Sequence, residues 1–266
     1  DYIDAGAGND LVEIASNFGA GVADGGAGED TLSFGAANDN IIFSGDDNTL
    51  SIASKVGKAT VALSGISGFE VYTGGAGNDT LDASGVTTQD MILTGGLGND
   101  LLVGGSGKDL LIADGGNDTL DLTKGGSDGI VLQPAADLNY SKKGVTTITV
   151  QGYDAEDYVN DSALTGEDAG WSKADAAVVD SKKKTTTFTY TQGSQTINVV
   201  FAGITDPNSI TFASQVVLGG NETGGDATST HPLRITATGG GNTANGGTRN
   251  DTITSTGGDT ISGHAG

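Results

Sequence analysis

Aspartates recur at nearly regular intervals along this chain, each at the end of a short glycine-rich loop. The clearest copies are 95–103 (GGLGNDLLV) and 104–112 (GGSGKDLLI), which follow one another without a gap. Carboxylates are hard oxygen ligands, and glycines allow a loop to turn its backbone carbonyls toward one point. Calcium prefers roughly six to eight such oxygens, more than one loop can supply. The pattern therefore indicates calcium binding by more than one copy together.

The same period defines the candidate metal ligands in the rest of the chain. Each candidate aspartate except Asp259, which belongs to a shortened copy, takes the sixth position of its copy. The copies around Asp39, Asp90 and Asp128 are degenerate. The candidate aspartates are Asp10, Asp30, Asp39, Asp79, Asp90, Asp100, Asp109, Asp118, Asp128, Asp251 and Asp259. The candidate loop glycines are Gly74, Gly75, Gly77, Gly95, Gly96, Gly98, Gly104, Gly105, Gly107 and Gly116.

An apolar residue follows each aspartate by two positions and should point inward. The triplet around it is too short for an ordinary strand, but stacked triplets can form parallel sheets. Inserted residues such as Leu122 should bulge outward. The predicted inward residues of the central block are Leu81, Ile92, Leu102, Leu111, Leu120 and Ile130.

The period divides the chain into five segments and predicts an all-β fold, because no segment has helical periodicity. Repeat blocks occupy 1–51 and 74–131, and a third, partly degenerate block occupies 219–266. Residues 52–73 break the period and are expected to form a connecting β segment. Residues 132–218 hold most of the aromatic side chains and several alternating runs. We expect an antiparallel β domain there, with a hairpin at Gly193-Ser194.

Composition narrows the choice of partners. The chain has 34 acidic and 12 basic residues, a net charge of −22 and no cysteine. Nucleic acid is excluded as a partner because phosphate binding needs positive charge. No apolar run is long enough to insert into a membrane. Bound calcium would neutralise the carboxylates, and without it we expect the repeats to be disordered by self-repulsion.

The nonapeptide G-G-x-G-x-D-x-U-x of 95–112, with U a large apolar residue, resembles the calcium-binding repeat of the RTX (repeats-in-toxin) family. Residues 65–70 also resemble segments that precede repeat blocks in RTX-type surface-layer proteins. The resemblance implies a parallel β-roll in which two repeats make one turn and calcium lies between loops two repeats apart. One edge would then carry Asp79, Asp100 and Asp118, and the other would carry Asp90, Asp109 and Asp128.

The resemblance also implies type I secretion, with the chain unfolded in calcium-poor cytoplasm and folded by calcium outside the cell. Because repeats reach both ends of the sequence, we expect a piece of a longer extracellular protein. The first hypothesis is a structural segment of a surface-layer subunit or adhesin, which associates with itself or with other surface components. A secretion and folding module of a hydrolase or toxin is the second. The third is glycan binding by the 132–218 domain through Trp171.

No enzymatic activity is expected. Residues 125–129 match the nucleophile motif G-x-S-x-G, but no helix is predicted after the serine, and the only histidines are His231 and His264. The acidic run 154–168 is interpreted as an exposed loop, with an extra calcium site as the alternative. Residues 182–184, three consecutive lysines, are interpreted as a solvated turn.

Overall fold

The chain forms two compact units. One comprises Asp1–Asp157 with Ala163–Ser209, and the other comprises Tyr158–Ser162 with Ile210–Gly266. No helix among the described residues has the length and apolar character needed to cross a bilayer. The computed structural model describes residues 2–14, 21–35, 39–45, 50–56, 59–67, 69, 71–133, 144–165, 171–174, 176–212, 214–218, 223–225, 233–237, 243–245, 252–255 and 260–262.

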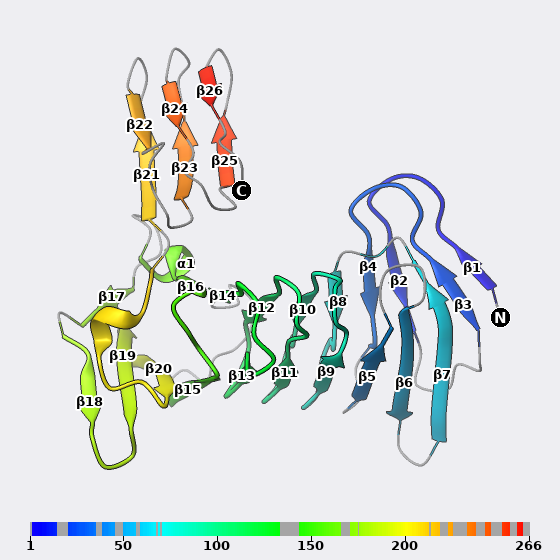
Figure 1. Ribbon diagram of the computed structural model, residues 1–266, viewed down its shortest axis with the longest axis horizontal. Coiled ribbons are helices and arrows are strands. Elements are labelled where there is room, and N and C mark those ends of the chain that lie inside the picture. Colours follow the sequence, from blue (N-terminus) through cyan, green and yellow to red (C-terminus); the bar gives the residue numbers. More distant parts are fainter. Residues whose placement is uncertain are drawn as a thin grey trace. The chain divides into compact units, whose positions relative to one another are not determined.

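Short strands of the first unit alternate between two sheets, so the chain coils as a roll (Figure 1). The order β14-β12-β10-β8-β4-β2 defines the first sheet, and β15-β13-β11-β9-β5 runs through the second. All neighbours within these two runs are parallel. The first-sheet strands are β2 (Leu11–Glu13), β4 (Thr31–Ser33), β8 (Val71–Thr73), β10 (Ile92–Thr94), β12 (Leu110–Ala113) and β14 (Gly129–Leu132). The second-sheet strands are β5 (Asn40–Ser44), β9 (Thr80–Gly85), β11 (Leu101–Val103), β13 (Thr119–Asp121) and β15 (Gly144–Gln151).

The core of the roll is a stack of the apolar residues that follow the aspartates. Leu102 lies between Leu81 and Leu120 in the second sheet. In the first sheet Leu111 lies beside Ile130, and all five side chains are fully buried. Burial of each leucine is worth roughly 1.5–3 kcal/mol. The predicted all-β fold with a parallel β-roll is confirmed, and two repeats form each turn.

Two predictions of side-chain direction are wrong. Leu93, not Ile92, is fully buried and pairs with Leu111. The reason is that β9 extends to Gly85, which leaves this glycine-poor copy with a longer loop and moves its anchor by one residue. Leu122 is 1 % exposed and packs inside instead of bulging outward.

The segment 52–73 joins both sheets of the roll. Strands β6 (Leu50–Val56) and β7 (Ala59–Ile66) form an antiparallel hairpin that extends the second sheet beyond β5. Strand β8 belongs to the first sheet, between β4 and β10. Its Tyr72 is buried and meets Phe43 of β5 edge-to-face, with ring centroids 5.0 Å apart. This aromatic pair links the two sheets at the point where the repeat period is interrupted.

The segment 132–218 contains both antiparallel and parallel pairing. The predicted hairpin is present, with β19 (Thr185–Gln192) and β20 (Gln195–Ala202) joined through Gly193, whose φ is 60°. Strands β17 (Ser172–Lys173) and β18 (Val178–Asp180) also pair antiparallel with β19. Strand β15, however, is parallel to both β13 and β20, so the second sheet of the roll continues into this segment.

The segment's aromatic core lies beside this continued sheet. Phe201 is fully buried, and the rings of Tyr153 and Phe188 lie edge-to-face against it, with ring centroids 5.2 and 6.0 Å away.

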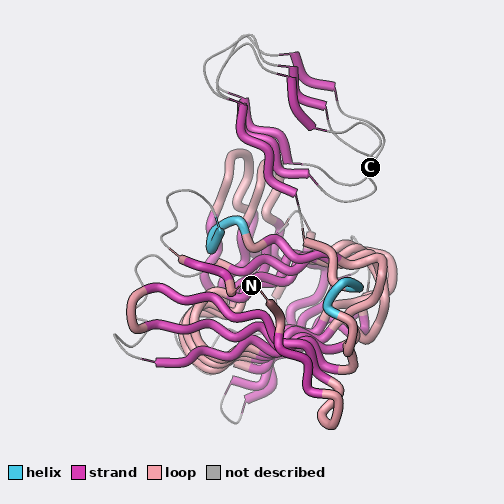
Figure 2. The backbone as a smooth tube through the Cα atoms, turned by 90° about the vertical axis from the view of Figure 1, so that its left-hand side faces the viewer, coloured by secondary structure: helices cyan, strands magenta, loops and turns pink. Residues whose placement is uncertain are grey.

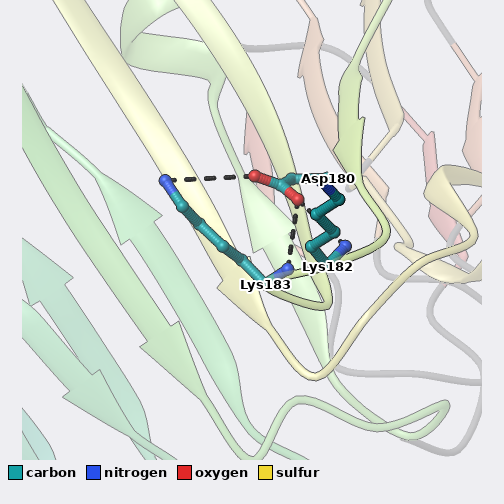
Figure 3. Close-up of polar contacts among 3 residues, drawn as sticks. All are labelled: Asp180, Lys182 and Lys183. Atoms are coloured by element: carbon teal, nitrogen blue, oxygen red, sulfur yellow. Dashed lines mark hydrogen bonds and ion pairs between the residues drawn. The ribbon is translucent and has the colours of Figure 1, made fainter.

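The turn between β18 and β19 lies at the surface. There Asp180 Oδ1 accepts hydrogen bonds from the backbone N–H groups of Lys182 and Lys183 (Figure 3). Lys183 Nζ lies 3.9 Å from Asp180 Oδ2, and residues 181–184 are exposed, as expected for a solvated turn.

The second unit is also built from short parallel strands. Strands β21 (Ser214–Leu218), β23 (Leu233–Ala237) and β25 (Thr252–Ser255) form one sheet. Strands β22 (Thr223–Gly225), β24 (Thr243–Asn245) and β26 (Thr260–Ser262) form another. Consecutive strands alternate between the two sheets, as in the roll of the first unit, and Figure 2 shows the strands of each sheet in magenta. Asp251 and Asp259 lie outside the described residues.

Candidate calcium sites along the roll edges

A ladder of aspartates runs along one edge of the second sheet, here called the second-sheet edge: Asp39, Asp79, Asp100 and Asp118. The backbone N–H of Asp39 donates to Asp79 Oδ1 at 2.7 Å. Asp79 N–H donates in the same way to Asp100 Oδ1 at 2.8 Å, and Asp100 N–H donates to Asp118 Oδ1 at 3.0 Å. Each aspartate therefore fixes the loop of the preceding turn. Asp79, Asp100 and Asp118 share one edge, as the resemblance implied.

A matching ladder, here called the first-sheet edge, consists of Asp10, Asp30, Asp109 and Asp128, each directly before a first-sheet strand, and of Asp157 in the 152–157 loop. Asp10 N–H donates to Asp30 Oδ1 at 2.8 Å. Further along, Asp109 N–H donates to Asp128 Oδ1, and Asp128 N–H donates to Asp157 Oδ1, both at 2.9 Å. Asp109 Oδ1 itself accepts from Met91 N–H at 2.8 Å, so a methionine occupies one rung.

The expected placement of Asp90 at the sixth position is wrong. Asp90 is exposed, and its Oδ1 accepts from Lys108 N–H at 2.7 Å. Asn78 Oδ1 makes the same bond with Asn99 N–H at 2.8 Å, and Asn78 is at the fifth position. The one-residue shift that makes Leu93 the anchor also moves Asp90 to the fifth position and gives Met91 the sixth. Asp90 thus shares the first-sheet edge with Asp109 and Asp128 without joining their ladder.

The second carboxylate oxygen of most rungs is buried without a partner. Each Oδ2 in this group is inaccessible to solvent and receives no hydrogen bond within the described part of the chain. A buried carboxylate oxygen without a donor or counterion costs several kcal/mol, so these positions require a cation or a proton. The residues concerned are Asp10, Asp39, Asp79, Asp100, Asp118 and Asp128.

Glycines bring backbone carbonyls close to these oxygens. A Cβ at Gly96 would collide with the carbonyl oxygen of Gly75, and one at Gly98 with that of Gly77. Both glycines also have positive φ, at 91° and 141°. A Cβ at Gly95 would instead collide with Asp100 Oδ2 of its own repeat. The loops of successive turns are therefore in backbone contact, with the aspartate oxygen beside them.

The other candidate glycines repeat these two roles. Gly74 and Gly104 approach the Oδ2 atoms of Asp79 and Asp109 in their own repeats. The glycines whose added Cβ would meet a carbonyl oxygen of the preceding turn are Gly75, Gly105, Gly107 and Gly116.

This donor set fits calcium. Among the described residues no three aspartate, glutamate, histidine or cysteine side chains gather to hold a metal alone. A bound ion must then take carboxylate oxygens together with loop carbonyls, and calcium accepts that mixture readily. Zinc sites are built mainly from nitrogen and sulfur ligands, and the chain has no cysteine.

The electrostatics of the ladders also favour a bound cation. Desolvation by burial raises the pKa of Asp79 to about 7, that of Asp118 to about 7 and that of Asp128 to about 8. Burial also raises the pKa of Asp39, Asp100 and Asp109. Neighbouring aspartates add to the shift in several of these groups, including Asp100 beside Asp79. A divalent ion next to these carboxylates would favour their charged form.

Two aspartates of the roll edges were missed by the sequence analysis. Asp114 stands at the second loop position, where a glycine is expected, and its Oδ1 accepts from Gly96 N–H at 2.9 Å and from Gly115 N–H at 3.1 Å. Burial raises its pKa to about 6. Its signal was an acid four residues ahead of Asp118. Asp157, interpreted as part of an exposed loop, is 3 % exposed and completes the first-sheet edge.

A comparison with protein families identifies the repeat. A family described as the RTX calcium-binding nonapeptide repeat, in four copies, matches residues 1–13, 64–85 and 92–126. The chain therefore contains RTX calcium-binding repeats. No curated protein matches this RTX chain. The matched ranges include Asp10, Asp79, Asp100, Asp109 and Asp118.

The RTX match stops short of several structural rungs. Asp30, Asp39, Asp128 and Asp157 lie outside the matched ranges, although hydrogen bonds join them to the same ladders. Asp90 and Met91 fall in the gap between 85 and 92, where the loop is irregular. The RTX roll is thus longer than its recognisable repeats.

Proposed function

We propose that this RTX protein is a calcium-dependent structural segment of a secreted bacterial cell-surface protein, either a surface-layer subunit or an adhesin. Type I secretion would export it, and calcium outside the cell would fold it. RTX repeats indicate a calcium-binding structural segment. We further propose that the segment associates with other copies of itself or with other surface components.

The repeated buried Oδ2 atoms along both edges carry this proposal. Their environment favours a cation at every turn, and the net charge of −22 opposes compaction until cations bind. Calcium supplies a divalent charge and accepts oxygen ligands from two loops at once. The chain's own aspartates and loop carbonyls hold those loops in register, and the leucine stack closes the roll. Metal binding and folding are therefore coupled.

The observations also support a role other than catalysis. Ser127, the serine of the G-x-S-x-G match, donates its hydroxyl hydrogen to the backbone carbonyl of Glu156 at 2.9 Å. The following residues enter strand β14 rather than the helix that a nucleophile elbow requires. We propose that Ser127 positions the 152–157 loop.

Light scattering and circular dichroism during a calcium titration test the proposal, with magnesium as the control. We expect β structure to form with calcium and ordered particles to grow above a threshold. A compact monomer at saturating calcium would favour the secretion module of a hydrolase or toxin over a surface array. No response to calcium would refute the proposal.

Glycan binding by the 132–218 segment is a second candidate. Trp171 is partly exposed to solvent, and an aromatic side chain there offers a surface on which a sugar can stack. Glycan-array binding that disappears in Trp171→Ala, with the calcium response intact, would support this role.

A further inference from the structure

The loop 152–157 has the position of a repeat loop without the repeat's sequence. Asp157 Oδ1 accepts from Asp128 N–H at 2.9 Å, as Asp128 Oδ1 accepts from Asp109 N–H. The two partners are 29 residues apart, compared with 19 at the preceding rung, because β15 and its lead-in are inserted. A search for a regular period therefore passes over this loop.

The sequence 152–160 nevertheless keeps the three residues on which a repeat depends. Gly152 is at the first position with a φ of 75°, and Asp157 is at the sixth. Val159 is at the eighth position and is fully buried in β16 (Tyr158–Asn160). A Cβ at Gly152 would lie 2.5 Å from the backbone nitrogen of Thr123, so the close approach of two turns recurs here.

An unpartnered buried oxygen lies next to this loop. Asp128 is 1 % exposed, and no described residue donates a hydrogen bond to its Oδ2. Asp157 and Asp154 are near enough for their negative charges to act on Asp128. Asp154 N–H donates to Asp157 Oδ2 at 2.8 Å, and Asp154 Oδ1 accepts from Glu156 N–H at 2.7 Å. The loop thus places two further carboxylates beside a buried oxygen that has no donor.

We propose that the loops 125–128 and 152–157 bind an additional calcium ion, with Asp128 and Asp154 as its carboxylate ligands and Asp157 adding negative charge beside them. Loop carbonyls and water complete the coordination, as at the repeat sites. This site rests on the proposed calcium-dependent function of the repeats, and it extends that function beyond the last recognisable repeat.

The additional ion would link the roll to the aromatic core of the next segment. Tyr153 donates its hydroxyl hydrogen to the backbone carbonyl of Asp157 at 3.0 Å, and its ring packs against Phe201. Ordering of the 152–157 loop by calcium therefore fixes both Tyr153 and the end of β15. The segment after the repeats then becomes sensitive to calcium without having repeats of its own.

The test counts calcium ions bound to the full chain by equilibrium dialysis with radioactive calcium. Asp154→Asn keeps the Oδ1 acceptor for Glu156 N–H and removes the charge, and Asp157→Asn removes the second charge. The matched control is Asp180→Asn, which makes the same change at an exposed turn. We expect each site variant to lose one ion, or to bind one ion at least tenfold more weakly, and the control to bind as the unsubstituted chain does.

Terbium luminescence provides a second readout, because terbium occupies calcium sites and emits when a nearby tyrosine is excited. Tyr153→Phe should lower the tyrosine-sensitised emission without changing the number of bound ions, and Asp154→Asn should lower both. Unchanged calcium number and affinity in Asp154→Asn and Asp157→Asn would overturn the additional site while leaving the repeat sites intact. A chain that binds no calcium at all would refute the proposed function as well.

Discussion

Both edges of the roll carry a ladder of aspartates, but the ladder of the second-sheet edge is regular and that of the first-sheet edge is not. On the second-sheet edge, Asp39, Asp79, Asp100 and Asp118 form consecutive rungs, and the ladder ends where β15 places the buried Ile148 opposite Asp118. On the first-sheet edge, Met91 interrupts the rungs, and a loop without the repeat sequence extends them. The lesson is that strand register is held by the inward anchors, so an edge tolerates an irregular loop.

The largest effect should come from breaking the regular edge at its backbone contact. Gly98→Ala would drive a Cβ into the carbonyl of Gly77 at a φ of 141°, so the turns must separate. We expect a loss of at least about 3 kcal/mol in unfolding free energy at saturating calcium. Urea denaturation measures it.

Gly125→Ala is the matched control for that substitution. Gly125 also has positive φ, at 75°, but a Cβ there meets no atom within 4 Å. Only the backbone strain should remain, at about 1–2 kcal/mol. Equal losses in the two variants would show that φ, and not the contact between turns, governs the edge.

A second prediction restores the missing rung of the irregular edge. Met91 is fully buried at a position that elsewhere holds an aspartate. Met91→Asp should lower the unfolding free energy by about 2–5 kcal/mol at a calcium concentration just sufficient to fold the chain, because a buried thioether is replaced by a buried charge. Saturating calcium should recover most of that loss.

Met91→Leu serves as the control, since a volume-conserving change should cost less than about 1.5 kcal/mol at limiting and at saturating calcium. Calorimetric melting at limiting and at saturating calcium separates the two variants. If Met91→Asp is destabilised equally in both conditions, the sixth position of this edge does not face a calcium site.

The irregular edge also shows how far the sequence could predict the fold. The strict period around 95–121 was enough to predict the inward leucines, and the resemblance to the RTX family implied the two-repeat turn. It failed at Leu93, because a copy without its glycines lets β9 run on and lengthens the loop. It failed at Asp157, because the inserted β15 hides a repeat that the fold preserves.

The sequence also did not predict which strands pair with one another. The alternation in 145–150 correctly indicates a strand, but nothing in it indicates that β15 pairs parallel with β13 of the roll. Asp114 was passed over because an acid at a glycine position looks like a lost repeat feature. Local patterns predicted the elements here, and the contacts between distant turns determined which side chains meet.

A third prediction uses pH to compare the ladders without metal. Burial raises the folded-state pKa of Asp79 and Asp118 to about 7 and that of Asp128 to about 8. Protonation therefore stabilises the folded form, fully below the ordinary aspartate pKa of about 4, and this stabilisation is lost as pH rises through 7 to 8. The calcium-free chain should be more stable at pH 5 than at pH 8 by at least about 1.4 kcal/mol, which is equivalent to one pKa unit.

Circular dichroism of the chelated chain measures this difference. With saturating calcium the trend should reverse, because protons then compete with the ion for the same oxygens. If carboxyl NMR signals are followed, Asp128 on the first-sheet edge should titrate above Asp79 and Asp118 on the second. A calcium-free chain that loses structure as the pH falls from 8 to 5 would contradict the buried, cation-dependent carboxylates.

The smallest effect concerns the fifth loop position, where the edges differ in chemistry. On the second-sheet edge, Asn99 Oδ1 accepts from both the backbone N–H and the side-chain amide of Asn117, at 2.8 and 3.1 Å. On the first-sheet edge, Asp90 accepts from Lys108 N–H, and its charge disfavours the ionised form of Asp109.

Asn99→Ala should therefore lower the unfolding free energy by about 1 kcal/mol. Asp90→Ala should cost less, because relief of the repulsion with Asp109 offsets the lost hydrogen bond. Urea denaturation of both variants at saturating calcium decides this, and a larger loss in Asp90→Ala would indicate that Asp90 is a calcium ligand despite its exposed position.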